Sequence, residues 1–162
     1  MQFALAPTAL ALALAAALTG PTGGPTGDPA DGAVPEADLA QHGDITMTGG
    51  LVTVGFTPQN HGPSDVPDTT VRLTWSVPLA DVQDELPDTC LRSGPRTVHC
   101  RTGALPAATY GTPLTVRVRL AAAPAEATVQ IATAWSGGFA DHNRQNDQHR
   151  VLVLDTGDTY YF

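Results

Sequence analysis

The stretch "TVRLTWSV", residues 70–77, alternates apolar and polar side chains without a break. Its apolar side chains, which would share one side of an extended strand, are Val71, Leu73, Trp75 and Val77. A period of two residues is typical of a β-strand with one buried and one solvated face. The stretch "LTVRVRL", residues 114–120, repeats the pattern with two arginines on its polar face. Both stretches therefore predict antiparallel sheet that covers a core on one side only.

Further short strands lie on either side of these two. "DITMT" (44–48) and "LVTVGFT" (51–57) are separated by a Gly-Gly pair (49–50), which predicts a tight turn. "ATVQIATAW" (127–135) and "HRVLVLD" (149–155) show the same period-two pattern. Seven to eight short strands with turn residues between them predict an all-β fold, an antiparallel β-sandwich.

Two details follow from this prediction. Trp75 and Trp135 are interpreted as core aromatics, because each lies on an alternating strand and indole rings bury a large apolar area. The segment "PLADVQDELPD", residues 78–88, is the one part of the domain whose pattern suggests helix, for one or two turns between its prolines.

The N-terminal part of the chain differs in composition from the rest. The first twenty residues, "MQFALAPTALALALAAALTG", are apolar and uncharged, and small residues follow their apolar core. This pattern predicts a secretory signal peptide over 1–20, with an N-terminal membrane anchor as the alternative. Residues 21–37 repeat Pro, Thr and Gly, which predicts a disordered linker before a domain over 38–162. We expect a secreted or cell-surface protein with no integral membrane span after signal cleavage.

The charge of the chain limits its partners. Eight arginines, no lysine and sixteen acidic residues give a formal net charge of −8. Such a protein is repelled on average by nucleic acid and by anionic membrane surfaces. The expected partner is therefore an unknown protein or glycan at the cell envelope.

Two cysteines flank a turn sequence. Cys90 and Cys100 enclose "LRSGPRTVH", and the Ser-Gly-Pro at its centre is typical of a hairpin turn. Two strands that leave one turn bring their cysteines side by side, within the separation that a disulfide requires. A metal pair or a redox pair is the alternative, although both usually have closer spacing or more ligands. Export favours a structural disulfide.

The turns carry a recognisable set of short motifs in a fixed order. They are "NHGPS" (60–64), "CRTGALPA" (100–107), "GTPLTVRV" (111–118) and "DHNRQND" (141–147). This order resembles the bacterial Ig-like conserved-repeat domain, a domain of unknown function, over roughly residues 38–154. The resemblance implies an Ig-like sandwich of a secreted or cell-surface protein. The residues that match the turn motifs of the family are Asn60, Gly62, Pro63, Ser64, Gly103, Leu105, Asp141, Asn143 and Asn146.

The last of these motifs is also a candidate calcium site. Asp141, Asn143 and Asp147 offer oxygen ligands at close spacing, and an acid such as Asp44 would complete the set. The EF-hand template fails because Leu152 occupies the position of its bidentate glutamate. The alternative is that these polar side chains bond to the backbone of the loop. We favour the second interpretation and expect no other cofactor.

No pattern of catalytic residues is found in the sequence. The serines lie outside any nucleophile elbow, and no two histidines have the spacing of a helical zinc motif. The prediction is a non-catalytic exported Ig-like module with a structural or protein-binding, adhesion-like role. A calcium- or carbohydrate-binding accessory module is the alternative. The C-terminal "DTGDTYYF", residues 155–162, is interpreted as an added edge strand or, alternatively, as a recognition tag.

Overall fold

The computed structural model describes residues 33–162, so the predicted signal peptide and residues 21–32 of the predicted linker lie outside the described residues. Within this range no helix is long and apolar enough to cross a membrane. The strands are β1 (Glu36–Ala37), β2 (Leu39–Thr48), β3 (Leu51–Asn60), β4 (Thr70–Trp75), β5 (Cys90–Gly94), β6 (Thr97–Arg101), β7 (Thr109–Tyr110), β8 (Leu114–Arg119), β9 (Glu126–Trp135), β10 (Ala140–Asp141), β11 (Gln148–Leu154) and β12 (Tyr160–Tyr161).

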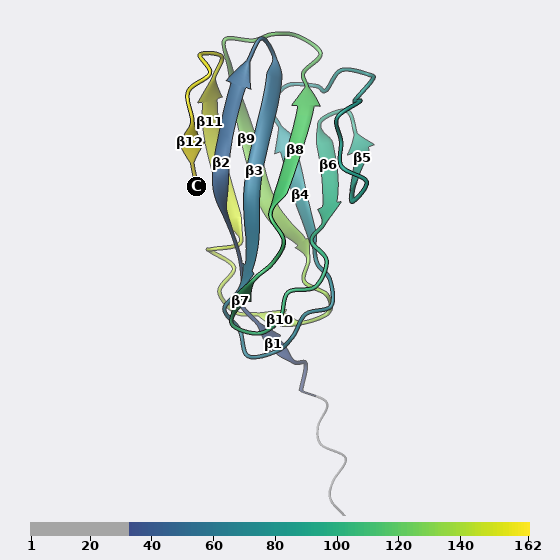
Figure 1. Cartoon of the computed structure of the whole chain (residues 1–162), viewed down its shortest axis with the longest axis vertical. Coiled ribbons are helices and arrows are strands. Elements are labelled where there is room, and N and C mark those ends of the chain that lie inside the picture. Colours follow the sequence, from purple (N-terminus) through teal and green to yellow (C-terminus); the bar gives the residue numbers. More distant parts are fainter. Residues whose placement is uncertain (1–32) are drawn as a thin grey trace, which may run out of the picture. The chain divides into compact units, whose positions relative to one another are not determined.

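Two sheets pack face to face and form an Ig-like antiparallel β-sandwich, as predicted (Figure 1). One, here called the β4 sheet, has the strand order β11-β9-β4-β6-β5. The other, the β3 sheet, has the order β12-β2-β3-β7, with β8 also paired to β3. β1 and β10 form a separate parallel pair at the lower end of the sandwich in Figure 1. Eight of the described strands contain five or more residues, which agrees with the predicted number.

Local sequence explains the strands and the tightest turn. In β8, buried and exposed side chains alternate at every position, so each strand residue either joins the core or faces solvent. Gly49 and Gly50 connect β2 to β3 with φ values of 58° and 74°. A two-residue hairpin turn with positive φ at both positions is the type that matches the twist of the strands. The predicted tight turn is confirmed.

Residues 78–88 contain no helix, so that prediction is wrong. The backbone of this segment bonds to β8 and to the β5–β6 turn instead: Ala80 N donates to Arg119 O at 2.8 Å, and Leu79 N donates to Pro95 O at 2.7 Å. These bonds replace the internal bonds of a helix, and only the tertiary fold supplies the partners.

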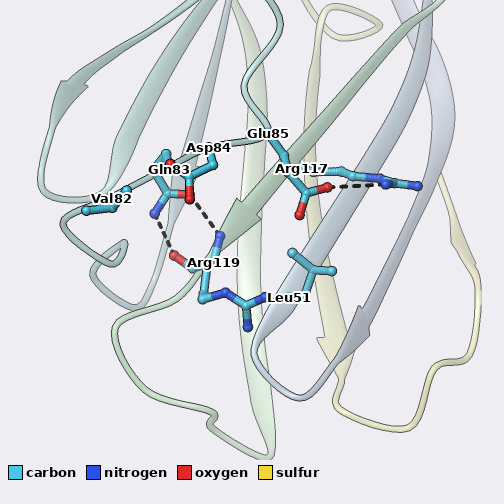
Figure 2. Close-up of a pocket in the computed structure, with 7 residues that line it drawn as sticks. All are labelled: Leu51, Val82, Gln83, Asp84, Glu85, Arg117 and Arg119. Atoms are coloured by element: carbon cyan, nitrogen blue, oxygen red, sulfur yellow. Dashed lines mark hydrogen bonds and ion pairs between the residues drawn. The ribbon is translucent and has the colours of Figure 1, made fainter.

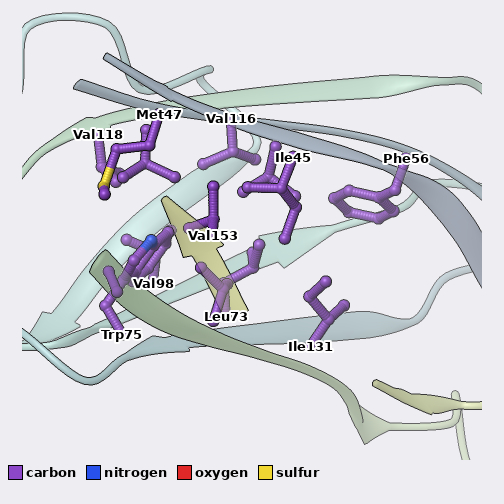
Figure 3. Packing of buried hydrophobic residues seen from close by; sticks show 14 of the residues in the cluster. Ile45, Met47, Phe56, Leu73, Trp75, Val98, Val116, Val118, Ile131 and Val153 are labelled. Atoms are coloured by element: carbon purple, nitrogen blue, oxygen red, sulfur yellow. The ribbon is translucent and has the colours of Figure 1, made fainter. Parts of the chain in front are cut away.

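The core lies between the two sheets (Figure 3). Ile45, Met47 and Val116 from the β3 sheet face Leu73 and Trp75 from the β4 sheet. The prediction for Trp75 is confirmed, since its side chain is buried.

Trp135, by contrast, is 52% exposed, and its assignment to the core is wrong. The reason is a bulge in β9. Val71 pairs with Thr133, but Thr70 pairs with Trp135, so one extra residue enters β9 at this point. An extra residue reverses the alternation of faces. The indole therefore lies on the outer face of the sheet, opposite Thr70.

The structure confirms the predicted disulfide. Cys90 and Cys100 are directly paired across β5 and β6, and their sulfur atoms are bonded. The hairpin turn lies between Gly94 and Thr97, one residue later than the centre of the predicted turn.

The C-terminal aromatic residues form an edge strand, the first of the two interpretations given above. Tyr160 and Tyr161 pair with Ile45 and Asp44 of β2. Phe162 continues the ladder, because its N–H and C=O exchange hydrogen bonds of 3.0 and 3.1 Å with Gly43.

Candidate functional site

The motif residues meet at the end of the sandwich that carries β1 and β10. Asn60 ends β3 and is completely buried. Its Oδ1 accepts from Gly62 N at 3.0 Å, while its Nδ2 donates to Ser64 O at 2.8 Å and to Leu105 O at 3.1 Å. One side chain thus joins two turns that lie more than forty residues apart in sequence. Gly62 has to be small here, because a Cβ would lie 2.6 Å from Ala37 Cα.

The last motif, residues 141–147, attaches to the same end through the beginning of β2. Asp141 Oδ2 accepts a hydrogen bond from Leu39 N at 3.0 Å, and its Oδ1 accepts one from Asn143 N at 2.9 Å. Asn146 Nδ2 donates to Asp38 Oδ1 at 2.8 Å. These bonds lie beside the β1–β10 pair, in which Ala37 is opposite Asp141. The predicted linker therefore ends too late, since its last two residues belong to a strand of the domain.

The remaining motif residues lie in the same turns, but among the described residues their side chains make no hydrogen bonds that join one turn to another. Pro63 is exposed, and Gly103 adopts a φ of 72° that favours glycine. We call the assembled set the polar end; its members are Asp38, Asn60, Gly62, Ser64, Leu105, Asp141 and Asn146.

One of the predicted calcium ligands, Asp44, lies apart from the loop that carries the others. Both carboxylate oxygens of Asp141 accept backbone N–H groups. Asp44 lies five residues beyond Leu39 on β2, which corresponds to about 16 Å along an extended strand. Within residues 33–162, no three His, Cys, Asp or Glu side chains form a cluster able to hold a metal ion. The contacts of Asp141 support the interpretation that this side chain bonds to the backbone, whereas Asp147 Oδ1 is buried without a hydrogen-bond partner among the described residues.

Two titratable groups next to this loop have shifted pKa values. The carboxyl of Asp147 is 1% exposed, and burial raises its pKa, with a further increase from the neighbouring charge of Asp141. Burial lowers the pKa of His149. The imidazole of His149 lies 6.0 Å from the ring of His42 and 5.1 Å from the ring of Phe162. β11 and the C-terminal residues thus meet at a half-buried histidine.

We expect His149 to make the fold less stable as the pH falls. Its pKa is lower in the folded chain than the ordinary 6.5, so the unfolded chain binds the proton more tightly. The stabilisation is fully present above pH 6.5 and is lost as the pH falls through the lowered pKa. One such group contributes a slope of at most about 1.4 kcal/mol per pH unit. Denaturant unfolding of the wild type and of His149→Gln at pH 7.5 and 5.5 measures this difference.

The matched control is His61→Gln, because the side chain of His61 is exposed and lies outside this cluster. The raised pKa of Asp147 has the opposite effect, a relative gain of stability as the pH falls, and is common to all three proteins. If His149→Gln loses as much stability between the two pH values as the wild type, the assignment to His149 is wrong.

A second candidate site is the outer edge of β8, which pairs only with β3. Figure 2 shows the carboxamide of Gln83 against this edge. Gln83 Oε1 accepts from Arg119 N at 2.9 Å, and Gln83 Nε2 donates to Arg119 O at 2.8 Å. Together with Ala80 N, which also donates to Arg119 O, the Gln83 side chain occupies the place of a neighbouring strand. Next to it, Glu85 and Arg117 form an ion pair of 3.2 Å.

The same edge is free nearer the start of β8. In an antiparallel strand the backbone groups of alternate residues point to the same side. Since Arg119 bonds outward to Gln83, the N–H and C=O of Arg117 and Thr115 also point outward. No neighbouring strand covers Thr115, because β8 pairs with β3 alone among the described strands.

A groove of about 370 Å³ borders this free edge, and its lining is mainly apolar. One wall contains Pro113, Leu114 and Thr115 from the start of β8, and another contains Pro87 and Thr89 from the segment before β5. The third side is formed by the end of β6 and the residues after it. An exposed backbone donor and acceptor therefore lie beside space for apolar side chains.

Sequence patterns did not indicate this edge. Gln83 belongs to the segment whose pattern suggests helix, and the alternation in residues 114–120 places Thr115 on the polar face of a strand without showing that its edge is unpaired. The order of strands in the sheet decides which edge is unpaired. The alternation of apolar and polar residues gives no information about that order.

Comparison of the chain with protein-family models, with curated proteins and with solved structures gives no match. The Ig-like assignment accordingly rests on the two packed sheets, and the resemblance to the conserved-repeat domain stays a prediction based on the turn motifs.

Proposed function

We propose that this chain is an exported, non-catalytic Ig-like module that binds a protein partner at the cell envelope or outside the cell. The observation that carries the proposal is the free backbone edge at Thr115 beside the apolar groove. An extended segment of the partner adds to such an edge through main-chain hydrogen bonds, and alternate side chains of the segment enter the groove. Export is supported by the apolar N-terminus, the turn motifs and the disulfide between Cys90 and Cys100.

The way the rest of the edge is covered supports this role. Gln83 saturates the backbone of Arg119, and Glu85 holds the side chain of Arg117. Proteins commonly cover unpaired edges, because an open edge pairs with other chains. Here the outward backbone groups of Arg117 and Thr115 have no strand partner among the described residues, so the open part is short, and its Thr115 end lies at the groove.

One pair of side chains has the composition of a nucleophile and a base. Ser93 Oγ lies 2.7 Å from His99 Nδ1 on the β5–β6 hairpin, where the Ser93 side chain is exposed. In serine hydrolases such a pair works beside preorganised donors for the oxyanion, with a carboxylate that orients the histidine. An exposed hairpin face is a poor place for that chemistry, which favours a binding role for the chain.

The test is the substitution Thr115→Pro. Proline removes only the outward N–H of this position and is tolerated on edge strands whose N–H faces solvent. We expect Thr115→Pro to weaken partner binding about tenfold, which corresponds to the loss of one main-chain hydrogen bond. The measurement is capture from culture medium and envelope extracts with the purified chain, followed by titration of the captured protein.

The matched control is Thr115→Ala, which keeps the N–H and changes the same side chain. It should bind like the wild type, and thermal melting should show that both variants are folded. Equal binding by Thr115→Pro would exclude the β8 edge as the contact. Failure of the wild-type chain to retain any protein would overturn the protein-binding function itself.

A further inference from the structure

The outer face of the β4 sheet carries two arginines on either side of β9. In the strand register, Arg72 on β4 and Gln148 on β11 both lie opposite Ala132 on β9. One step further along, Arg150 lies opposite Gln130. Directly paired residues point to the same side of a sheet, so all five side chains share the outer face.

The centre of this face is a shallow hollow of about 230 Å³. Ala132 has the smallest side chain of the group, and longer side chains border it on three strands. Gln148 is held in place by a hydrogen bond of 3.1 Å from its Nε2 to Arg144 O. The lining is mainly polar, with two guanidinium groups and two carboxamides.

Neither arginine of this hollow has an acidic partner. In the part of the chain that the structure describes, the ion pairs involve Arg101, Arg117 and His142. Arg72 and Arg150 are exposed, and their guanidinium groups make no hydrogen bond to another described residue. Two free guanidinium groups on one face of a strongly acidic chain are complementary to carboxylates, which arginine binds in a bidentate manner.

The exposed tryptophan lies on the same face. Trp135 is opposite Thr70, which is two residues from Arg72 on β4 and thus about 7 Å along the strand. We call the set the arginine face; its members are Arg72, Gln130, Ala132, Trp135, Gln148 and Arg150. An indole that is half exposed beside hydrogen-bonding groups is suited to stack on an apolar ring face while its neighbours bond polar groups.

We propose that the arginine face binds an acidic polysaccharide whose sugars carry carboxylates. Arg72 and Arg150 bind carboxylates, Gln130 and Gln148 bond to hydroxyl groups, and Trp135 stacks on a sugar ring. Two strand spacings and a two-residue offset separate the arginines by about 12 Å at the backbone. This separation suits carboxylates that are two sugars apart on one chain. The site is on the opposite sheet from β8, so it goes beyond the protein-binding function and does not depend on it.

A glycan fits this face better than an acidic protein. A protein interface usually has a dry apolar centre surrounded by polar groups. On the arginine face the centre is the polar hollow, and the aromatic ring lies to one side of it. Carboxamides and guanidinium groups around a small residue offer the directional donors that sugar hydroxyls and carboxylates require.

The experiment is titration of the purified chain at 0.15 M salt, where weak surface attraction is largely screened (about 8 Å Debye length). The probes are polygalacturonate, alginate and hyaluronan, each beside its carboxyl-reduced form, and polyglutamate as the acidic peptide. We expect at least one acidic glycan to bind and its reduced form not to bind. Arg72→Gln and Arg150→Gln should each lower the affinity about tenfold, through loss of a charge-assisted contact.

The control is Arg96→Gln, which removes the same charge from an exposed turn between β5 and β6 and should change the affinity less than about twofold. Trp135→Ala should weaken glycan binding without affecting any binding of polyglutamate. The proposal is overturned if no acidic glycan binds or if Arg96→Gln weakens binding as much as the other two. Tighter binding of polyglutamate than of every glycan would also overturn it, in favour of an acidic protein ligand.

Discussion

Replacement of Asn60 by alanine is expected to lower the free energy of unfolding by about 4 kcal/mol, because it leaves two backbone groups at this end of the sandwich without their partner. These groups are Gly62 N and Ser64 O, whereas Leu105 O still accepts a hydrogen bond of 2.9 Å from Val66 N. A buried donor or acceptor that loses its partner keeps its desolvation cost, about 1–3 kcal/mol for each group. Denaturant unfolding followed by circular dichroism measures the change.

The matched control is Asn143→Ala. Both asparagines belong to the motifs that resemble the conserved-repeat family, but the Asn143 side chain is exposed at the same end of the sandwich. Its replacement should cost less than about 0.5 kcal/mol, the usual range for a surface position. Similar losses for the two variants would contradict the assignment of Asn60 as the residue that joins the turns.

Replacement of Trp75 by alanine is expected to cost about 3–5 kcal/mol, the range for removal of a large aromatic side chain from a packed core. Trp75 is fully buried and faces Met47 and Val118 across the sandwich (Figure 3). Removal of the indole leaves a cavity between two sheets that the neighbouring core side chains hold apart, so the space cannot close completely. Chemical unfolding at pH 7 gives this value directly.

Two comparisons make the Trp75 prediction specific. Trp135→Ala removes the same side chain from an exposed position and should cost about 1 kcal/mol or less. Trp75→Phe should cost less than Trp75→Ala, since it keeps most of the ring and removes an indole N–H that has no partner among the described residues. A loss of stability as large for Trp135→Ala as for Trp75→Ala would show that Trp75 does not occupy the main core.

Local patterns were sufficient for most of the sandwich. Period-two alternation in residues 70–77 and 114–120 predicted which side chains are buried in β4 and β8. The pair Gly49-Gly50 predicted the β2–β3 turn, because only a few residue types adopt positive φ at low cost. The positions of Cys90 and Cys100 on either side of a turn predicted the disulfide, because a short hairpin brings the two residues directly opposite each other.

The wrong predictions have identifiable causes. Counted from Val129 and Ile131, strict alternation puts Trp135 in the core, and the bulge that reverses it is created by the pairing of β9 with β4. The helix expected over residues 78–88 is absent because β8 and the β5–β6 turn supply hydrogen bonds to the backbone of this segment. In both places a neighbour that is distant in sequence decided the outcome.

The candidate sites show the same division. The turn motifs were visible in the sequence. Their contacts with one another form only because the end of β3, the loop after β6 and the start of β2 meet at one end of the sandwich. The free edge at Thr115 and the alignment of Arg72 with Arg150 depend on strand order.

By itself, the sequence determined the β-strands, their buried faces, the Gly-Gly turn and the disulfide, because each depends on residues close together in the chain. Only the tertiary structure decided which edge of β8 remained open, which face carried two unpaired arginines and on which side of the sheet Trp135 lay. These features depend on strand order and register, and hydrogen bonds between distant strands set both.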